Sequence, residues 1–153
     1  MIDYKLLTAQ LKSLADDDHY FIPVLSNASA LLYDSLPDLN WAGFYLVRDD
    51  QLVLGPFQGK VACIHIAKGR GVCGTAWATG ETQMIDNVHE FPGHIACDGA
   101  SNSEIVVPIH NKNTAEIIGV LDIDSPSLSR FKNEDKDGLE AFVKALEEVV
   151  TWD

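Results

Sequence analysis

Two apolar segments in the second half of the chain constrain the fold most, because their alternation suits the strands of a sheet. The segments are "EIVVPIH", residues 104–110, and "EIIGVLDID", residues 116–124, and the turn "NKNTA" joins them. Successive side chains of a strand point to opposite faces, so Asp122 and Asp124 share one face while the apolar residues beside them take the other. A half-buried strand seldom directs two carboxylates inward without a reason, so this sheet is expected to carry a polar site.

Three other segments predict helices that pack on this sheet. The helical spacing of apolar residues recurs in residues 2–15, 22–36 and 134–150. In the second of these segments Pro23 is tolerable because it falls in the first turn. Four apolar side chains of that helix are expected on its buried side: Ile22, Leu25, Leu32 and Leu36.

Aromatic and branched residues predict further strands upstream. Residues 40–57 are typical of a hairpin, and residues 60–66 alternate as a third strand. In this third strand Val61, Cys63 and His65 are expected on one face, and Ala62, Ile64 and Ile66 on the other. A glycine-rich turn leads into a short helix within residues 67–80, and a long loop covers residues 87–102. The sum is a single α+β domain over residues 1–153, a central antiparallel sheet flanked by N-terminal and C-terminal helices.

Composition and charge exclude several classes of partner. The chain carries 11 basic and 23 acidic residues, a formal net charge of −12, which repels nucleic acid and anionic membranes. No apolar run reaches the ~20 residues that span a bilayer, and the start "MIDYKLL" lacks a secretion signal. An odd count of three cysteines does not suit a closed set of structural disulfides. We therefore expect a cytoplasmic protein whose thiols are kept reduced.

Each of the three cysteines has a structural and a functional interpretation. Cys63 alone is as easily a core thiol as a reactive one. Cys73, in "GRGVCG", is expected in the first turn of a helix, where the dipole favours a thiolate, although a small residue also fills a tight turn there. Cys97, in the polar loop "GHIACDGASNSE", is the strongest functional candidate. His94 could stabilise its thiolate or could simply be a solvated loop histidine.

The acidic residues form a second candidate group. Glu104 begins the strand that neighbours Asp122 and Asp124, so the three carboxylates are expected to converge at one end of the sheet. Carboxylates forced together raise one another's pKa, and at least one could then hold a proton near neutral pH and act as an acid. The alternative is that the two aspartates cap the turn before Pro126.

Metal and phosphate binding are weaker alternatives. The possible metal ligands are Cys63, His65, Cys73, His94 and Cys97. Their spacing lacks the close cysteine pairs by which zinc sites are usually recognised, so no metal site is predicted. The glycines around Cys73 hint at a phosphate loop, but the lysine and the serine or threonine of a nucleotide-binding signature are absent after them.

Five segments in order, "NWAGFYL", "LVLGPFQGKVAC", "GRGVCGTA", "GHIACDGASNSEIVVPI" and "IIGVLDIDS", resemble the free methionine-(R)-sulfoxide reductases. These enzymes are built on a single GAF domain, which is the fold that the resemblance implies. The similarity runs from about residue 20 to the final helix. All three cysteines and all three candidate carboxylates fall inside the matching segments.

The resemblance also implies roles for residues. It makes Cys97 the nucleophile, Cys63 the thiol that resolves it and Cys73 an auxiliary thiol, with the order of Cys97 and Cys73 left open. It assigns the substrate's polar groups and the sulfoxide oxygen to Glu104, Asp122 and Asp124. Further substrate-binding positions implied by the resemblance are Trp41, Tyr45, His94, Ile95 and Ala96.

The implied reaction is thiol-dependent reduction of free L-methionine-(R)-sulfoxide to methionine. A thiolate attacks sulfur while an acid protonates the oxygen; the cysteine becomes a sulfenic acid and then a disulfide. An external dithiol such as thioredoxin would reopen the disulfide, and no bound cofactor is expected. The resemblance suggests a homodimer as well. Three rival functions remain at this stage: a GAF module that only binds a small ligand, a thiol redox sensor, and a structural metal site.

Overall fold

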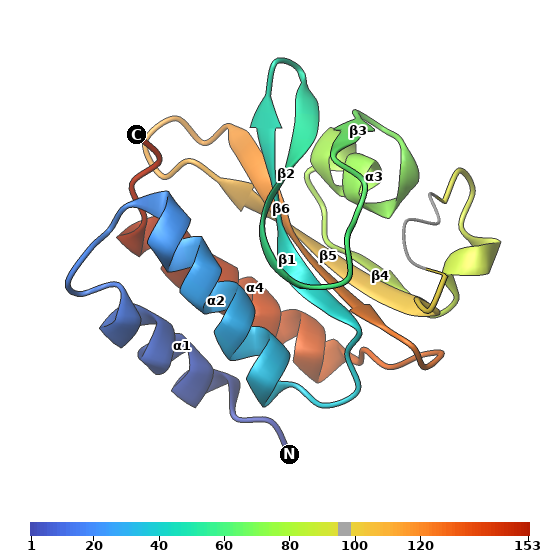
Figure 1. Cartoon of the computed structure of the whole chain (residues 1–153), viewed down its shortest axis with the longest axis horizontal. Coiled ribbons are helices and arrows are strands. Elements are labelled where there is room, and N and C mark those ends of the chain that lie inside the picture. The colour runs from blue at the N-terminus through green and yellow to red at the C-terminus, as the bar shows by residue number, and fades with distance from the viewer. Residues whose placement is uncertain (95–98) are drawn as a thin grey trace.

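The computed structural model describes residues 1–94 and 99–153 (Figure 1). The chain runs through α1 (Tyr4–Leu14), α2 (Phe21–Ser35), β1 (Trp41–Arg48), β2 (Gln51–Gly59), β3 (His65–Ala67), α3 (Gly71–Thr79), β4 (Gln83–Ile85), the 3-10 helix η1 (Val88–Glu90), β5 (Ser103–His110), β6 (Ile117–Ser125) and α4 (Asn133–Val149). The six strands form one sheet in the order β3-β2-β1-β6-β5-β4, and every neighbouring pair is antiparallel. The α+β class and the central antiparallel sheet are therefore confirmed.

The sheet separates two apolar layers of different size. On one face α1, α2 and α4 bury a large core against the central strands, with Phe44, Leu121 and Ile123 fully buried beneath them. On the other face α3 covers a smaller cluster that includes Tyr45 and Val120. Figure 1 shows the three long helices together on one side and α3 with β3 on the other. The alternation along β1 and β6 directs every second side chain to each layer.

Most of the predicted elements are confirmed, with one error in the buried side of α2. Pro23 does lie in the first turn, and Leu25, Leu32 and Leu36 are buried. Ile22, however, is 48% exposed. The buried stripe of α2 is formed by Val24, Leu25, Ala28, Ser29 and Leu32. Ile22 lies at the edge of this stripe, in the first turn, and so faces solvent.

The predicted third strand over residues 60–66 is wrong for most of its length. Strand pairing begins only at His65, opposite Val53, and the strand ends at Ala67. Upstream, the carbonyl oxygens of Lys60 and Cys63 accept hydrogen bonds from side chains of β1 instead of forming a ladder. The alternation consequently fails, and Val61 and Ile64 are 87% and 61% exposed.

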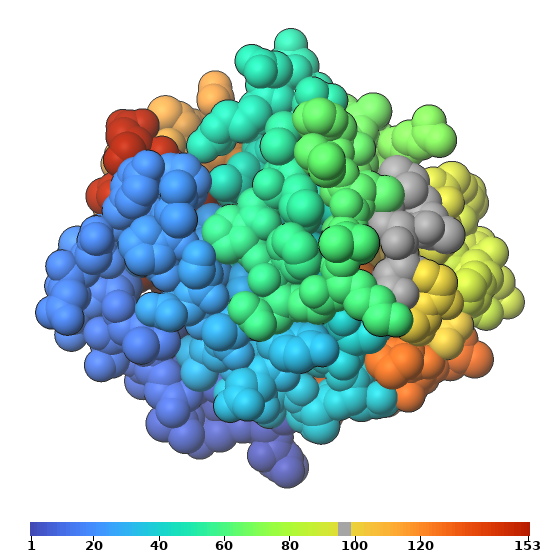
Figure 2. All heavy atoms as spheres, viewed as in Figure 1, coloured from blue at the N-terminus to red at the C-terminus, as the bar shows by residue number. Residues whose placement is uncertain are grey.

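This segment after β2 lies at the surface. Figure 2 shows it in green across the middle of one face of the molecule, beside α2. The structure also adds two short elements that the sequence did not predict, β4 at the edge of the sheet and η1 within the loop after it. No helix in the described ranges has the length and apolar character that crossing a membrane requires.

Candidate active site

Three adjacent strands bring the predicted carboxylates together on the face of the sheet that α3 covers. In the antiparallel register Glu104 of β5 lies opposite Asp124 of β6, and Trp41 of β1 lies opposite the same aspartate from the other side. Asp122 is two residues along β6, so its side chain projects from the same face. Glu104 and Asp122 are only 6% and 5% exposed. The predicted convergence of the three carboxylates is confirmed.

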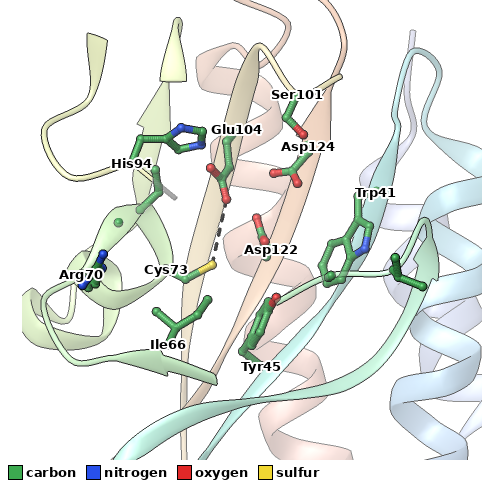
Figure 3. A pocket seen from close by; sticks show the side chains of 14 residues that line it. Trp41, Tyr45, Ile66, Arg70, Cys73, His94, Ser101, Glu104, Asp122 and Asp124 are labelled. Atoms are coloured by element: carbon green, nitrogen blue, oxygen red, sulfur yellow. Dashed lines mark hydrogen bonds between the residues drawn. The ribbon is translucent and has the colours of Figure 1, made fainter. Parts of the chain in front are cut away.

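The thiol of Cys73 faces these carboxylates from α3. Its residue is the third of the helix, as the glycine-rich turn predicts, and it is 5% exposed. Sγ lies 4.0 Å from Oε2 of Glu104, the contact drawn as a dashed line in Figure 3. Gly74 allows this close approach of helix and sheet, because a Cβ at that position would lie 2.6 Å from the carbonyl oxygen of Ala67.

A narrow cavity of about 50 Å³, partly open to solvent, lies between α3 and the sheet. Figure 3 shows the thiol and the carboxyl groups pointing into it. Its lining comes from several elements: Trp41, Tyr45, Val61, Ala62, Ile66, Arg70, Gly71, Val72, Cys73, His94, Ser101, Glu104, Asp122 and Asp124.

Two aromatic rings form the apolar wall of the cavity. The centroids of Trp41 and Tyr45 are 5.9 Å apart, and Phe57 stacks on the other side of the indole at 5.1 Å. The indole nitrogen donates to the carbonyl of Lys60 at 3.1 Å, and the Tyr45 hydroxyl donates to the carbonyl of Cys63 at 2.8 Å. Both rings are therefore held in place, and both tether the segment that carries Cys63.

The carboxyl cluster retains protons more strongly than isolated carboxyl groups do. Burial, followed by the charge of Asp122, raises the pKa of Glu104 and the pKa of Asp124 well above their ordinary values. The Oδ1 atoms of Asp122 and Asp124 are buried and have no hydrogen-bond partner in the described part of the molecule. Like charges this close cannot all be ionised without a compensating cation, so the cluster is suited to hold a proton or to receive a positive group.

The structure does not favour a thiolate at Cys73, which was one of the two interpretations of this residue. The first turn of a helix favours a thiolate, but burial and then the neighbouring Asp122 and Glu104 raise the pKa of the Cys73 thiol well above its ordinary value. The half-charge at a helix N-terminus is smaller than the combined effect of desolvation and nearby carboxylates. The surroundings of Cys73 therefore favour the protonated form of its thiol.

The described part of the chain includes one group of possible metal ligands, Cys73, Glu104 and Asp122, whose ligand atoms lie within 4.8 Å of one another. His65 lies outside this group, on the exposed strand β3. No spacing of residues along the chain predicted such a group, because its members come from three separate elements.

With this geometry in view, comparisons with known proteins decide the family. Residues 25–150 match the model of the GAF domain. Free methionine-R-sulfoxide reductase of Escherichia coli is 56% identical over 147 residues, which cover 96% of this chain and 88% of that protein. The structure of Staphylococcus aureus fRMsr in its reduced form is 53% identical with a TM-score of 0.93 and covers 99% of this chain and 97% of its own. The chain belongs to the free methionine-R-sulfoxide reductases.

A second relative of known structure has its substrate bound. The free methionine-R-sulfoxide reductase of Neisseria meningitidis, in complex with its substrate, is 43% identical to this chain with a TM-score of 0.90. It covers 95% of this chain and 86% of its own. The sequence resemblance and the GAF-like fold are thus both confirmed. The extent of the domain, residues 1–153, stays a prediction.

Several predicted site residues of the reductase gather at the cavity. Those brought together are Trp41, Tyr45, Cys73, His94, Glu104, Asp122 and Asp124. Burial and the nearby His89 lower the pKa of His94, which makes it a poorer cation than the sequence interpretation required. Cys63 lies in the segment whose neighbours Val61 and Ala62 line the cavity. Ile95, Ala96 and Cys97 lie outside the described residues, so their predicted roles stay predictions.

The structure adds residues to the reductase site that the sequence analysis missed. Ser101 lines the cavity, and its Oγ accepts a hydrogen bond from Nδ2 of Asn40 at 3.0 Å. Arg70 also lines the cavity, at the residue that precedes α3. Its place within "GRGVCG" was a usable signal, since a residue just before a cavity-facing helix is near the ligand.

Proposed function

We propose that this chain reduces free L-methionine-(R)-sulfoxide to L-methionine by thiol chemistry. The observation that carries the proposal is the meeting of Glu104, Asp122 and Asp124 with an aromatic wall in one small cavity. The relatives named above, one of them studied with its substrate, support the same reaction class.

The cavity matches the two ends of a free amino acid sulfoxide. Its acidic floor can pair with the ammonium group, which a methionine inside a peptide lacks. The rings of Trp41 and Tyr45 offer an apolar surface to the methyl group and the side chain of the substrate. This division of polar and apolar surface favours the free amino acid over a methionine sulfoxide residue in a protein.

The raised pKa of Glu104 and of Asp124 supplies the acid that the reaction needs. Sulfoxide oxygen leaves sulfur readily only when it is protonated, so a carboxyl group that keeps its proton near neutral pH lowers the barrier. A pKa close to the working pH suits a general acid, and burial followed by the charge of Asp122 raises the pKa of both carboxyl groups in that direction.

In the proposed cycle Cys97 attacks the sulfoxide sulfur, the protonated oxygen passes to the cysteine as a sulfenic acid, and methionine leaves. The thiol of Cys63 then attacks the sulfenic sulfur and expels water, leaving a disulfide between the two cysteines. The balance is one sulfoxide and two thiols consumed for one thioether, one disulfide and one water formed. Cys73 serves as an auxiliary thiol, and which of Cys73 and Cys97 attacks first stays open.

An external dithiol must then regenerate the thiols by exchange, and we propose a thioredoxin for this step. No bound cofactor takes part in the proposed cycle. The homodimer and the cytoplasmic location stay predictions. Gel filtration of the purified chain would test the homodimer. Reduction of its oxidised form by thioredoxin, with thioredoxin reductase and NADPH, would test the proposed reductant.

A single-turnover assay tests the proposed function. Fully reduced protein, without added reductant, is mixed with each epimer of free methionine sulfoxide, and methionine formed and thiols lost are counted. We expect about one methionine per chain from the R epimer, with two thiols consumed, and none from the S epimer. If Cys97 attacks first, Cys97→Ser should abolish methionine formation and Cys73→Ser should not; the reverse result would make Cys73 the nucleophile. Cys63→Ser should permit one turnover without a disulfide between Cys63 and Cys97.

Other outcomes identify the rival functions. No methionine from either epimer, with all thiols intact, would contradict the proposal and favour a GAF module that only binds a ligand. Thiol oxidation by peroxide without any turnover of methionine sulfoxide would favour a redox sensor. Protein in which zinc is retained through purification and whose Tm drops on chelation would favour a structural metal site.

A further inference from the structure

The thiol of Cys73 and two carboxyl groups form a compact set of ligand atoms on one side of the cavity. Sulfur of Cys73 and one oxygen each from Glu104 and Asp122 lie within 4.8 Å of one another, and all three residues are buried. The three residues come from α3, β5 and β6, and the pairing of β5 with β6 fixes the relative positions of Glu104 and Asp122. Figure 3 shows the three groups pointing toward a common centre.

A separate observation is that one carboxylate oxygen of this group has no hydrogen-bond partner among the described residues. Oδ1 of Asp122 is buried and has no hydrogen-bond partner in the part of the chain that the structure describes, and the residue is only 5% exposed. A buried carboxylate oxygen without a donor is costly unless a cation or proton meets it. Asp122, which carries this oxygen, lines the same cavity as Cys73.

We propose that Cys73, Glu104 and Asp122 of the reduced chain bind one thiophilic divalent cation, Zn²⁺ or Cd²⁺, which occupies the position of the substrate's polar groups. Binding blocks the site. The sequence predicts no metal cofactor. This proposal is compatible with that prediction, because the ion would act as an inhibitor and not as a cofactor.

The geometry suits a tetrahedral ion after a small adjustment. Zinc lies about 2.3 Å from thiolate sulfur and about 2.0 to 2.2 Å from carboxylate oxygen, which puts neighbouring ligand atoms about 3.5 Å apart. The present distance from Sγ of Cys73 to Oε2 of Glu104 is 4.0 Å. This gap must close by about half an ångström, and the other two separations are at most 4.8 Å. Three protein ligands leave a fourth position for water from the open side of the cavity.

The ligand types select the class of cation. One sulfur and two carboxylate oxygens suit a borderline or soft metal, whereas Mg²⁺ and Ca²⁺ require six or more oxygen ligands. On binding, the thiol of Cys73 releases its proton to solvent, as does the carboxyl group of Glu104 when it is protonated. A metal–sulfur bond and two metal–oxygen bonds form, and the ion remains divalent. No electron is transferred. Among the described residues that line the cavity, Arg70 is the one with a permanent positive charge, and it is exposed.

A spectroscopic titration tests binding without reference to catalysis. Co²⁺ replaces Zn²⁺ as the probe, because a cobalt–thiolate bond absorbs in the near ultraviolet. Reduced wild-type protein should develop this absorption to one equivalent of Co²⁺ per chain, and Zn²⁺ or Cd²⁺ should abolish it by displacement. Asp122→Asn should weaken Co²⁺ binding by at least about tenfold.

The cysteine variants decide the location. Cys73→Ser should lose the absorption, and Cys63→Ser, which removes a thiol outside the trio, should retain it. Absorption that persists in Cys73→Ser, or that disappears in Cys97→Ser with Cys73 intact, would overturn the proposed site. If Cys73→Ser does not fold, Glu104→Gln provides the second test, and unchanged affinity in that variant would also overturn it.

Only the inhibition rests on the proposed function. In the single-turnover assay Zn²⁺ should reduce the rate, and excess methionine sulfoxide should reverse this effect. Wild-type protein that binds Co²⁺ but never forms methionine would refute the proposed function while leaving the metal site intact. Protein that forms methionine at an unchanged rate with a saturating amount of bound Zn²⁺ would refute the inhibitory role.

Discussion

The substitution Glu104→Gln should make the protein more stable and at the same time a poorer catalyst. Glu104 is 6% exposed and lies opposite Asp124 in the sheet, beside Asp122. Burial and these neighbours raise its pKa well above the ordinary value of 4.5. The amide has almost the same shape, carries no charge and can donate to the two aspartates, so it removes the unfavourable ionisation without leaving a void.

The magnitude follows from proton linkage. Above pH 4.5 the folded chain binds more protons at this site than the unfolded chain, so the free energy of unfolding falls as pH rises toward the raised pKa. Each pH unit in this window costs about 1.4 kcal/mol, which amounts to at most about 3 kcal/mol at pH 7 and less than about 1 kcal/mol at pH 5. Glu104→Gln should recover these amounts.

Urea unfolding of the reduced protein at pH 5, 6, 7 and 8 measures the effect. The difference in free energy of unfolding between variant and wild type should grow with pH. Glu116→Gln is the matched control, because Glu116 is exposed and its side chain makes no hydrogen bond to another described residue; its effect should stay within about 0.5 kcal/mol. The same preparation of Glu104→Gln should show single-turnover reduction slowed by about 10²-fold or more. A pH-independent difference, or a normal rate, would refute the reasoning.

Three further predictions concern the frame and the chemistry of the site. Gly74→Ala should lower Tm by several degrees, because the new Cβ would lie 2.6 Å from the carbonyl oxygen of Ala67. Gly99→Ala, whose Cβ would meet no atom of the described residues within 4 Å, should leave Tm unchanged. Tyr45→Phe removes the 2.8 Å hydrogen bond to the carbonyl of Cys63 and should lower the free energy of unfolding in urea by about 1 kcal/mol. It should also delay thiol loss after methionine release. Simultaneous methionine release and thiol loss would show that this hydrogen bond does not position the segment that carries Cys63. The single-turnover rate of the wild type should fall at alkaline pH as the acid loses its proton, and a flat profile from pH 6 to 10 would exclude a carboxyl acid with a raised pKa.

The sequence predicted the carboxylate cluster because its determinants are local. Asp122 and Asp124 alternate with Leu121 and Ile123, and the two strands that carry Glu104 and the aspartates are joined by a short turn. Alternation and hairpin register together then place the three carboxylates on one face. The short distance along the chain between the strands made this inference possible.

Other features were not predictable, since they depend on contacts distant along the chain. Residues 60–64 alternate like a strand, but the side chains of Trp41 and Tyr45 take their carbonyl groups. Burial, followed by carboxyl groups 49 and 31 positions later in the sequence, raises the pKa of the Cys73 thiol despite its helix position. Neither effect leaves a pattern within the local segment.

The central strand β6 serves the core and the site with the same four residues. Leu121 and Ile123 are fully buried under the long helices, while Asp122 and Asp124 face the cavity on the opposite side. Strands β1 and β5 pair with β6 on both edges, so this segment cannot shift alone. Directed evolution of substrate range is therefore best aimed at α3 and the segment after β2, because a library at residues 121–124 would select for foldability and chemistry at once.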